Sequence, residues 1–282
     1  MSDIPNSEEQ TYWSGPSGQS WIRHEAAQDR LLSEILRTVL DRADLSAGER
    51  FLDIGCGTGA LSVAAAQATG PTGRGLATDI SQPLLRRAAA RLRQAPHVST
   101  LLADAEVAEW PETGFDVALS RLGVMFFAHP PRAFANIAGA LRSGGRMVFA
   151  AWAPVARNPY WRDPARLATD RLGDVSKTEP NTPGPMGMAD ADWSLAQLRS
   201  AGLEDVACEE VEVGLPIDGS AEDAADLALA IGPAARVVRL HDASPADVAA
   251  IRDDIAHDMQ QYRDGGTVRI PAVLNLYTAR VR

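Results

Sequence analysis

The sequence predicts an α/β fold in which helices cover both faces of a doubly wound, mostly parallel sheet, and three observations lead to this class. The apolar run Phe51–Ile54 ends in a glycine turn, Gly-x-Gly-x-Gly, at residues 55–59. A second apolar run, residues 75–78, ends in Asp79 at the reach expected of a strand-helix-strand unit. Strand-like and helical patterns then alternate as far as Trp152, which is typical of a sheet whose ligand lies beyond the carboxyl ends of its strands.

The N-terminal part of the chain predicts a cover over this sheet. Residues 1–24 are polar with aromatic side chains among them, and residues 26–42 repeat leucine, isoleucine and valine at helical spacing. A helix with one apolar stripe buries that stripe against a neighbouring layer. The core elements are then predicted in this order: strand 50–55, helix 59–68, strand 75–79, a helix that begins near Pro83, strand 98–103, strand 115–120, a helix after Pro130-Pro131 that Gly144-Gly145 stops, and strand 147–152.

The second half of the chain departs from this alternation. Residues 153–190 hold six prolines, and such a stretch between a core strand and the next helix is typical of a cap over a site. Further helices are predicted at 192–201 and after Ser220 and Ser244. Alternating residues predict strands at 206–213 and 273–281.

Composition argues against several classes of function. The 282 residues carry a formal net charge of −10, and a surface that follows nucleic-acid phosphates is basic, so no nucleic-acid partner is expected. No apolar stretch reaches transmembrane length and the first ten residues are polar and acidic, so we expect no membrane insertion and a cytoplasmic location. The two cysteines have no metal-binding spacing, and no metal is expected.

The order of the glycines indicates which ligand the turn binds. A dinucleotide fingerprint reads Gly-x-Gly-x-x-Gly and places a pyrophosphate on the following helix. Here Asp53 precedes a Gly-x-Gly-x-Gly turn, and a carboxylate is a poor neighbour for a pyrophosphate. We therefore expect a nucleoside whose polar end is cationic, with Asp79 accepting hydrogen bonds from its ribose hydroxyls.

These residues resemble motif I of the class I S-adenosylmethionine-dependent methyltransferases, and four further landmarks follow in that family's order. They are residues 78–81 for the second-strand acid, 102–105 for the third-strand acid, 115–121 for the fourth strand and 141–146 for the turn into the fifth. Residues 12–21 and 123–127 are similar to a bacterial subgroup of small-molecule methyltransferases that includes the ubiquinone/menaquinone type. The resemblance implies a Rossmann-like sheet of seven strands with an antiparallel last strand, an N-terminal helical cover and a helical cap.

The resemblance also implies S-adenosyl-L-methionine as cofactor and S-adenosyl-L-homocysteine as product. It assigns the glycine turn and Asp53 to the methionine end, Asp79 to the ribose and Asp104 to the adenine. For Asp79 the alternative role is a helix cap, and for Asp104 a turn residue. The full set of expected cofactor-binding residues is Tyr12, Trp21, Asp53, Gly55, Gly57, Gly59, Asp79, Ile80, Asp104, Ala105, Ser120 and Arg121.

The aromatic residues Tyr12, Trp13 and Trp21 have two open interpretations. They can fold over the cofactor, where an aromatic face suits a sulfonium, or they can pack the cover on the sheet. The expected organisation of the chain is 1–48 as N-terminal cover, 49–152 as cofactor-binding core, 153–190 as cap insertion, 191–214 as return to the core, 215–266 as helical cap and 267–282 as the last core strand.

The expected activity is that of an EC 2.1.1 enzyme, which methylates an oxygen, nitrogen or carbon atom of a small, partly hydrophobic metabolite. Positioning and desolvation supply most of the rate, because orientation alone contributes roughly 7–11 kcal/mol. His129 is the candidate general base, with an ordinary polar residue before a helix as the alternative. Two other functions stay open, a nucleoside-binding regulatory or non-methylating homologue and a nicotinamide oxidoreductase. The expected state is a monomer or homodimer.

Overall fold

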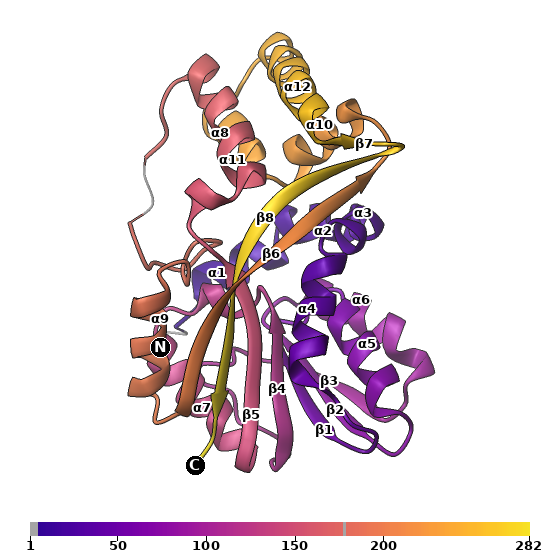
Figure 1. Cartoon of the computed structure of the whole chain (residues 1–282), viewed down its shortest axis with the longest axis vertical. Coiled ribbons are helices and arrows are strands. Elements are labelled where there is room, and N and C mark those ends of the chain that lie inside the picture. Colours follow the sequence, from indigo (N-terminus) through magenta and orange to yellow (C-terminus); the bar gives the residue numbers. More distant parts are fainter. Residues whose placement is uncertain (1–4, 177–178) are drawn as a thin grey trace.

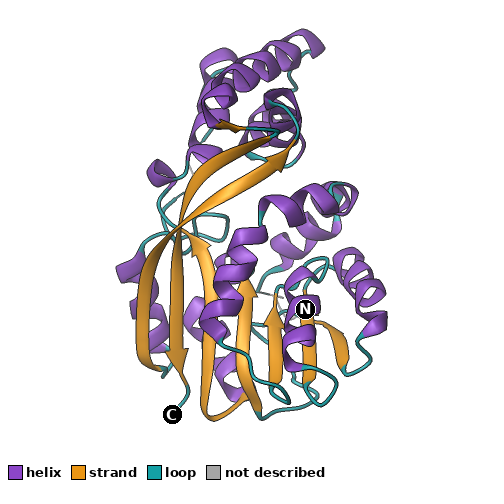
Figure 2. Ribbon diagram, turned by 45° about the vertical axis from the view of Figure 1, so that its right-hand side comes forward, coloured by secondary structure: helices purple, strands orange, loops and turns teal. Residues whose placement is uncertain are grey.

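One mixed sheet forms the centre of the structure (Figure 1 and Figure 2), and the computed structural model of the chain describes residues 5–176 and 179–282. The strands are β1 (Arg50–Ile54), β2 (Arg74–Asp79), β3 (Val98–Leu102), β4 (Phe115–Arg121), β5 (Leu141–Trp152), β6 (Glu204–Asp218), β7 (Arg263–Asp264) and β8 (Thr267–Arg280). The helices are α1 (Ser7–Ser14), α2 (Pro16–Arg23), α3 (Glu25–Leu31), α4 (Ser33–Ala43), α5 (Ala60–Thr69), α6 (Gln82–Arg91), α7 (Pro130–Ala140), α8 (Pro159–Leu172), α9 (Ala191–Ser200), α10 (Ala221–Ala230), α11 (Pro233–Leu240) and α12 (Pro245–Met259). Four 3-10 turns complete the set: η1 (Leu92–Gln94), η2 (Val124–Phe126), η3 (Val155–Arg157) and η4 (Gln260–Tyr262).

The sheet has the order β3-β2-β1-β4-β5-β8-β6, with the short β7 paired to β8. Strands β1 to β5 are mutually parallel, whereas β8 runs antiparallel to both β5 and β6. The predicted doubly wound sheet with an antiparallel last strand is therefore confirmed. Since all five parallel strands end at the same edge, the side chains that follow β1, β2, β3 and β4 are brought together there.

Apolar strands explain the position of the core. Phe51 and Leu52 of β1 and Phe115 and Val117 of β4 are fully buried, as expected for a parallel sheet covered on both faces. In Figure 1, α4, α5 and α6 lie on one face and α7 and α9 on the other. None of the helices in the described part of the chain is long and apolar enough to cross a bilayer.

The upper part of the molecule is built on a two-stranded ribbon. Strands β6 and β8 continue above the sheet and carry α8, α10, α11 and α12, while α1 to α3 lie across the ends of the parallel strands (Figure 1). An ion pair of 2.8 Å between Arg30 of α3 and Asp218 of β6 joins this cover to the ribbon. The expected division of the chain into cover, core and cap segments stays a prediction.

Several predicted elements differ from those found. The helix expected at 26–42 is two helices, α3 and α4, interrupted at Leu32, and the polar first segment is also helical, as α1 and α2. Helix α7 ends at Ala140, so Gly144-Gly145 does not stop it but lies within β5, where Gly144 adopts a φ of 72°. The short helices α1 to α3 were not predicted as separate helices, because helices of this length are stabilised by tertiary packing rather than by a local sequence pattern.

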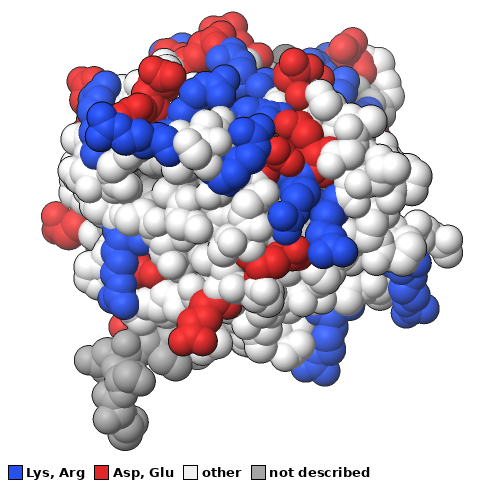
Figure 3. All heavy atoms as spheres, turned by 90° about the horizontal axis from the view of Figure 1, so that it is seen from below, with Lys and Arg blue, Asp and Glu red and all other residues white. Residues whose placement is uncertain are grey.

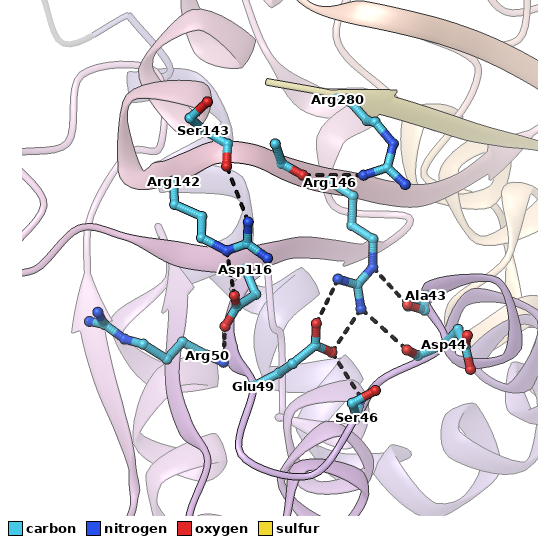
Figure 4. A network of polar contacts seen from close by, with 11 residues as sticks. Ala43, Asp44, Ser46, Glu49, Arg50, Asp116, Arg142, Ser143, Arg146 and Arg280 are labelled. Atoms are coloured by element: carbon cyan, nitrogen blue, oxygen red, sulfur yellow. Dashed lines mark hydrogen bonds and ion pairs between the residues drawn. The ribbon is translucent and has the colours of Figure 1, made fainter. Parts of the chain in front are cut away.

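The amino edge of the sheet, at the lower end of Figure 1, is closed by paired charges. Arg146 donates to Glu49 at 2.8 Å and to the Ala43 carbonyl at 2.8 Å, and Arg142 pairs with Asp116 at 2.6 Å (Figure 4). Seen from below, acidic and basic side chains lie next to one another over this end (Figure 3). These pairs connect α4 and the start of β1 with β4 and β5. The ligand is expected at the opposite edge, where the parallel strands end.

Candidate functional site

The glycine turn after β1 is packed closely on one side and open on the other. Gly55, Gly57 and Gly59 have φ values of 66°, 56° and 86°, which side chains rarely tolerate. A Cβ on Gly55 would lie 2.8 Å from the Cα of Gly123, in the turn after β4. A Cβ on Gly57 would meet nothing within 4 Å, so this part of the turn borders open space. The backbone of the turn is therefore exposed to a ligand on one side and packed against a second turn on the other.

Asp79 connects this turn to the end of β2. Its Oδ2 accepts a hydrogen bond of 2.8 Å from the Gly57 amide and its Oδ1 one of 2.8 Å from the Ser81 amide. Burial raises the pKa of Asp79 to about 6, although these amide hydrogen bonds oppose the change. The helix cap expected as the alternative is supplied by Ser81, whose Oγ accepts from the Leu84 amide. Asp79 thus keeps lone pairs for a further donor.

Asp53 is buried beneath the turn with one oxygen unused. Its Oδ2 accepts from the Ser62 hydroxyl at 2.5 Å, whereas Oδ1 has no hydrogen-bond partner in the described part of the protein. Burial raises the pKa of Asp53 to about 7, opposed by the Ser62 hydrogen bond and by the charge of Arg121. A buried carboxylate oxygen without a partner is rare, and this oxygen is available to a hydrogen-bond donor of a ligand.

Arg121, at the end of β4, brings a cation to the same place. Its side chain is only 9% exposed, and its Nη2 lies 3.8 Å from Asp29 of the cover, while Nη1 has no partner among the described residues. Arg91 of α6 forms an ion pair with the other Asp29 oxygen, with its Nη2 at 2.8 Å. The sequence predicted Arg121 but not Asp29 or Arg91, because only the fold brings α3 and α6 next to β4.

Asp104 lies beyond β3 and contacts the cover through Asn6. The Asn6 amide, in a residue that is 5% exposed, donates to both Asp104 oxygens at 2.9 and 3.0 Å and to Glu106 at 3.2 Å. The Glu106 amide donates to Asp104 Oδ1 as well. Oδ1 therefore has two donors and Oδ2 has one, which leaves one lone pair on Oδ2 for a ligand.

His129 does not lie at the acids that follow β1 and β2. Its Nδ1 is 2.7 Å from Oε1 of Glu106, and its side chain is 65% exposed. Glu106 lies beside Asp104, since Asn6 donates hydrogen bonds to both residues. The backbone amide of His129 also donates to Glu106 at 3.1 Å. The ring thus closes a polar cluster beside Asp104, and this position gives no support to the expected role as general base.

The aromatic residues of the cover centre on Trp13. Its ring meets Trp21 at 5.8 Å and Phe126 at 5.4 Å in edge-to-face geometry, and its carbonyl accepts from Ser81 Oγ at 2.7 Å. Tyr12 is 47% exposed and contacts only the outer edge of this group. The structure therefore places Trp13 and Trp21, rather than Tyr12, across the strand ends.

The other expected residues lie along the same edge. Ser120 is buried and its hydroxyl bridges the Ile54 carbonyl and the Gly123 amide, at 2.7 and 3.1 Å, so it fixes the two turns relative to each other. Ile80 is half-buried beside Asp79, and the Ala105 carbonyl accepts from Asn136. Together, the residues that follow four neighbouring strands form a polar, partly unpaired edge beneath an aromatic cover.

Comparison with known proteins agrees with this geometry. Residues 52–149 match the methyltransferase domain family. These residues of the chain form a methyltransferase domain. Domains of this class use S-adenosylmethionine as their cofactor. The expected nicotinamide and non-methylating alternatives gain no support from these matches.

Two curated relatives resemble the methyltransferase domain in sequence. Nocamycin O-methyltransferase from Saccharothrix syringae is 32% identical over 126 residues, which cover 44% of this chain and 45% of that protein. A ubiquinone/menaquinone biosynthesis C-methyltransferase from Burkholderia mallei is 37% identical over 108 residues, 38% of this chain and 44% of the relative. The chain thus spans less than half the length of either relative.

Solved structures extend the likeness in fold to the rest of the chain. An S-adenosylmethionine-dependent methyltransferase from Aquifex aeolicus has a TM-score of 0.51 at 16% identity, covering 70% of this chain and 92% of that one. Phosphoethanolamine N-methyltransferase 2 from Haemonchus contortus has a TM-score of 0.56 at 15% identity, covering 99% of this chain and 60% of that one. At these identities the likeness concerns the fold alone.

Proposed function

We propose that the protein binds S-adenosylmethionine at the carboxyl edge of its sheet and transfers the methyl group to a small, partly hydrophobic molecule. The observation that carries this proposal is the pair of unused polar atoms under the glycine turn. Asp53 Oδ1 is an acceptor without a donor, and Arg121 Nη1 is a donor without an acceptor among the described residues. The α-ammonium and α-carboxylate of the cofactor supply one partner for each.

The rest of the nucleoside follows the strand order. Asp79 accepts hydrogen bonds from the ribose hydroxyls through lone pairs that the Gly57 and Ser81 amides leave unused. Asp104 Oδ2 accepts from the adenine amino group while Asn6 holds the carboxylate in place. Tyr12, Trp13 and Trp21 belong to the cover over this nucleoside, with Trp13 in the central place.

Catalysis in this proposal depends on position. Methyl transfer is a displacement along one line, and holding the reacting atoms contributes roughly 7–11 kcal/mol. Trp13 and Phe126 exclude water from the edge, which strengthens the electrostatic contacts of the buried Asp53 and Arg121. A small acceptor, rather than a nucleic acid, fits the net charge of −10.

Calorimetric titration of the whole chain with S-adenosylhomocysteine and, separately, with NAD tests the cofactor. We expect saturable binding of the first and none of the second. Transfer of a labelled methyl group from S-adenosylmethionine to members of a metabolite panel then tests the reaction. Binding of NAD alone would contradict the proposal, and tight cofactor binding with no methylated product would support a non-methylating homologue.

A further inference from the structure

Two consecutive side chains at the start of α8, Tyr160 and Trp161, carry hydrogen-bond donors that have no acceptor among the described residues. Tyr160 is 4% exposed, and burial alone raises the pKa of its hydroxyl, which accordingly stays a neutral donor. The indole Nε1 of Trp161 is also buried and has no partner among the described residues. A buried tryptophan usually finds a hydrogen-bond partner, so the unpaired indole of Trp161 indicates a partner that comes from outside the chain. The Tyr160 hydroxyl, which is less deeply enclosed than the indole nitrogen, offers the same partner a second donor.

These donors lie next to the proposed cofactor site. The rings of Trp161 and Trp152 are 5.8 Å apart, and Trp152 ends β5. In the sheet, Arg121 of β4 is paired with Ala150 of β5, two residues before Trp152. At the rise of a strand, this separation is about 7 Å. The aromatic group of Trp152, Tyr160 and Trp161 therefore lies one step beyond the edge that holds the cofactor's charged end, where a methyl acceptor has to bind.

The segment that carries the donors is fixed by the core. Asn158 is fully buried, and its amide donates to the carbonyls of Ala153 and Val273 at 2.9 and 3.1 Å. Its Oδ1 accepts from the Val273 amide at 3.0 Å. Because the Asn158 side chain is hydrogen-bonded to Val273 of β8, it does not cap the first turn of α8. The first turn of this helix therefore adds the positive end of its dipole to the two unpartnered donors.

We propose that Tyr160 and Trp161 bind an oxygen atom of the methyl acceptor, which is a planar, apolar molecule with a hydroxyl, enol or carbonyl group. This assignment rests on the proposed function. Donors without acceptors select an oxygen, and the surrounding indole and phenol rings select a flat apolar body. The first turn of α8 contains no acid, and Asp163 in the following turn is already paired with Arg162 by hydrogen bonds of 2.8 and 2.9 Å, so it leaves the donors available.

A cationic ligand is the competing chemistry, because Asp258 of α12 has an unpartnered Oδ2 and Asp163 raises its pKa further after the effect of burial. Three probes separate the two. We would titrate the full chain, saturated with S-adenosylhomocysteine, with 1-naphthol, naphthalene and 1-naphthylmethylammonium. 1-Naphthol is expected to bind about 5–10-fold more tightly than naphthalene, the effect of one or two hydrogen bonds. Equal binding of these two, or tightest binding of the cation, would overturn the proposal.

Two variants make this test specific. Tyr160→Phe should remove most of the preference for 1-naphthol while leaving the affinity for S-adenosylhomocysteine unchanged. Tyr277→Phe is the matched control, because this buried hydroxyl already donates to the Met188 carbonyl at 2.9 Å, and it should retain the preference. In 15N spectra, the indole signal that Trp161→Phe deletes should shift with 1-naphthol and not with naphthalene. A preference that survives Tyr160→Phe, or an indole signal that ignores the oxygen, would contradict the assignment.

Failure of this proposal is distinguishable from failure of the proposed function. S-adenosylhomocysteine binding reports on the cofactor edge and does not involve Tyr160. If the chain binds S-adenosylhomocysteine but does not distinguish 1-naphthol from naphthalene, only the acceptor assignment is wrong. If it binds no S-adenosylhomocysteine, the cofactor assignment is wrong, and the naphthol preference of the unliganded chain still tests the two donors.

Discussion

The two edges of the sheet carry similar residues in opposite states. At the amino edge, the partly buried Glu49 and Asp116 are paired with Arg146 and Arg142. At the carboxyl edge, Asp53 and Arg121 are buried and each keeps one polar atom without a partner. Charges that the fold has already neutralised hold the structure together, whereas charges that the fold buries and leaves incomplete are available to a ligand.

The pKa values of the carboxyl groups at the two edges move in opposite directions, because partners dominate at one edge and burial at the other. The hydrogen bonds of Arg146 hold the pKa of Glu49 below its ordinary value. Burial raises the pKa of Asp53 to about 7 and that of Asp79 to about 6. The raised values record a cost of desolvation that no internal partner removes, and a cationic ligand at Asp53 would remove it.

Substitution of Gly55 is expected to have the largest effect on the carboxyl edge. Gly55→Ala places a Cβ 2.8 Å from Gly123 at a φ of 66°, and we expect it to lower the free energy of unfolding by about 2–4 kcal/mol. Gly57→Ala is the matched control, because its Cβ meets nothing within 4 Å, and it should cost only about 1–2 kcal/mol. Urea unfolding measures both. If the free energy of unfolding fell equally in the two variants, the close contact between Gly55 and Gly123 would not contribute to stability.

Neutralising one acid at each edge tests the comparison itself. Asp79→Asn should weaken S-adenosylhomocysteine binding by about 10–100-fold with the fold intact, because it removes charge-assisted hydrogen bonds. Asp116→Asn, at the amino edge, should leave this affinity unchanged and lower stability by about 1–2 kcal/mol, because it weakens both the pair with Arg142 and the hydrogen bond from the Arg50 amide. Calorimetry and thermal unfolding report the two effects. If Asp79→Asn left the affinity for S-adenosylhomocysteine unchanged, Asp79 would serve only to hold the turn through its hydrogen bonds with Gly57 and Ser81.

The pH dependence of the unliganded chain and of binding should have opposite signs. Asp53 keeps its proton up to about pH 7 when folded but loses it near pH 4 when unfolded, so its contribution makes the free energy of unfolding decrease as pH rises from about 4 to about 7. A bound ammonium needs the carboxylate form, so affinity for S-adenosylhomocysteine should fall as pH drops below about 7, by up to about tenfold per unit. Calorimetry from about pH 5.5 to 8.5 checks this, and Asp53→Asn should flatten the curve.

The features that could be predicted from the sequence are those that depend on short local motifs. The glycine turn, Asp53 and Asp79 lie next to the ends of their own strands, so the sequence predicted both their place at the strand ends and the mostly parallel class of the sheet. Asn6, Asp29 and Tyr160 were not predicted, because their roles depend on segments far away in the chain. Asn6 meets Asp104, and Asp29 meets Arg121, only after the cover has packed on the sheet.

The cover offers a smaller test. Asn6→Ala should weaken S-adenosylhomocysteine binding about threefold, because Asp104 loses the amide that orients it but keeps its own oxygens for adenine. The measurement is again calorimetric, with Tyr12→Phe at the exposed end of the cover as control. Tighter binding in Asn6→Ala would show instead that the Asn6 amide competes with the adenine amino group.

The smallest expected effect is at His129. A general base contributes about 10²–10⁴-fold to a rate, and an exposed ring paired with Glu106 is poorly placed for that role. We therefore expect His129→Ala to change the methyl-transfer rate on the best acceptor of the panel by less than about threefold. Loss of activity by orders of magnitude would return His129 to the active site.

A crystal structure with S-adenosylhomocysteine tests most directly whether the carboxyl edge binds the cofactor, because each unpaired atom of this edge is expected to contact one particular group of the ligand. We expect the ligand ammonium within hydrogen-bond distance of Asp53 Oδ1, its carboxylate on Arg121 and its ribose hydroxyls on Asp79. A ligand bound elsewhere, with Asp53 and Arg121 still lacking partners, would contradict the account.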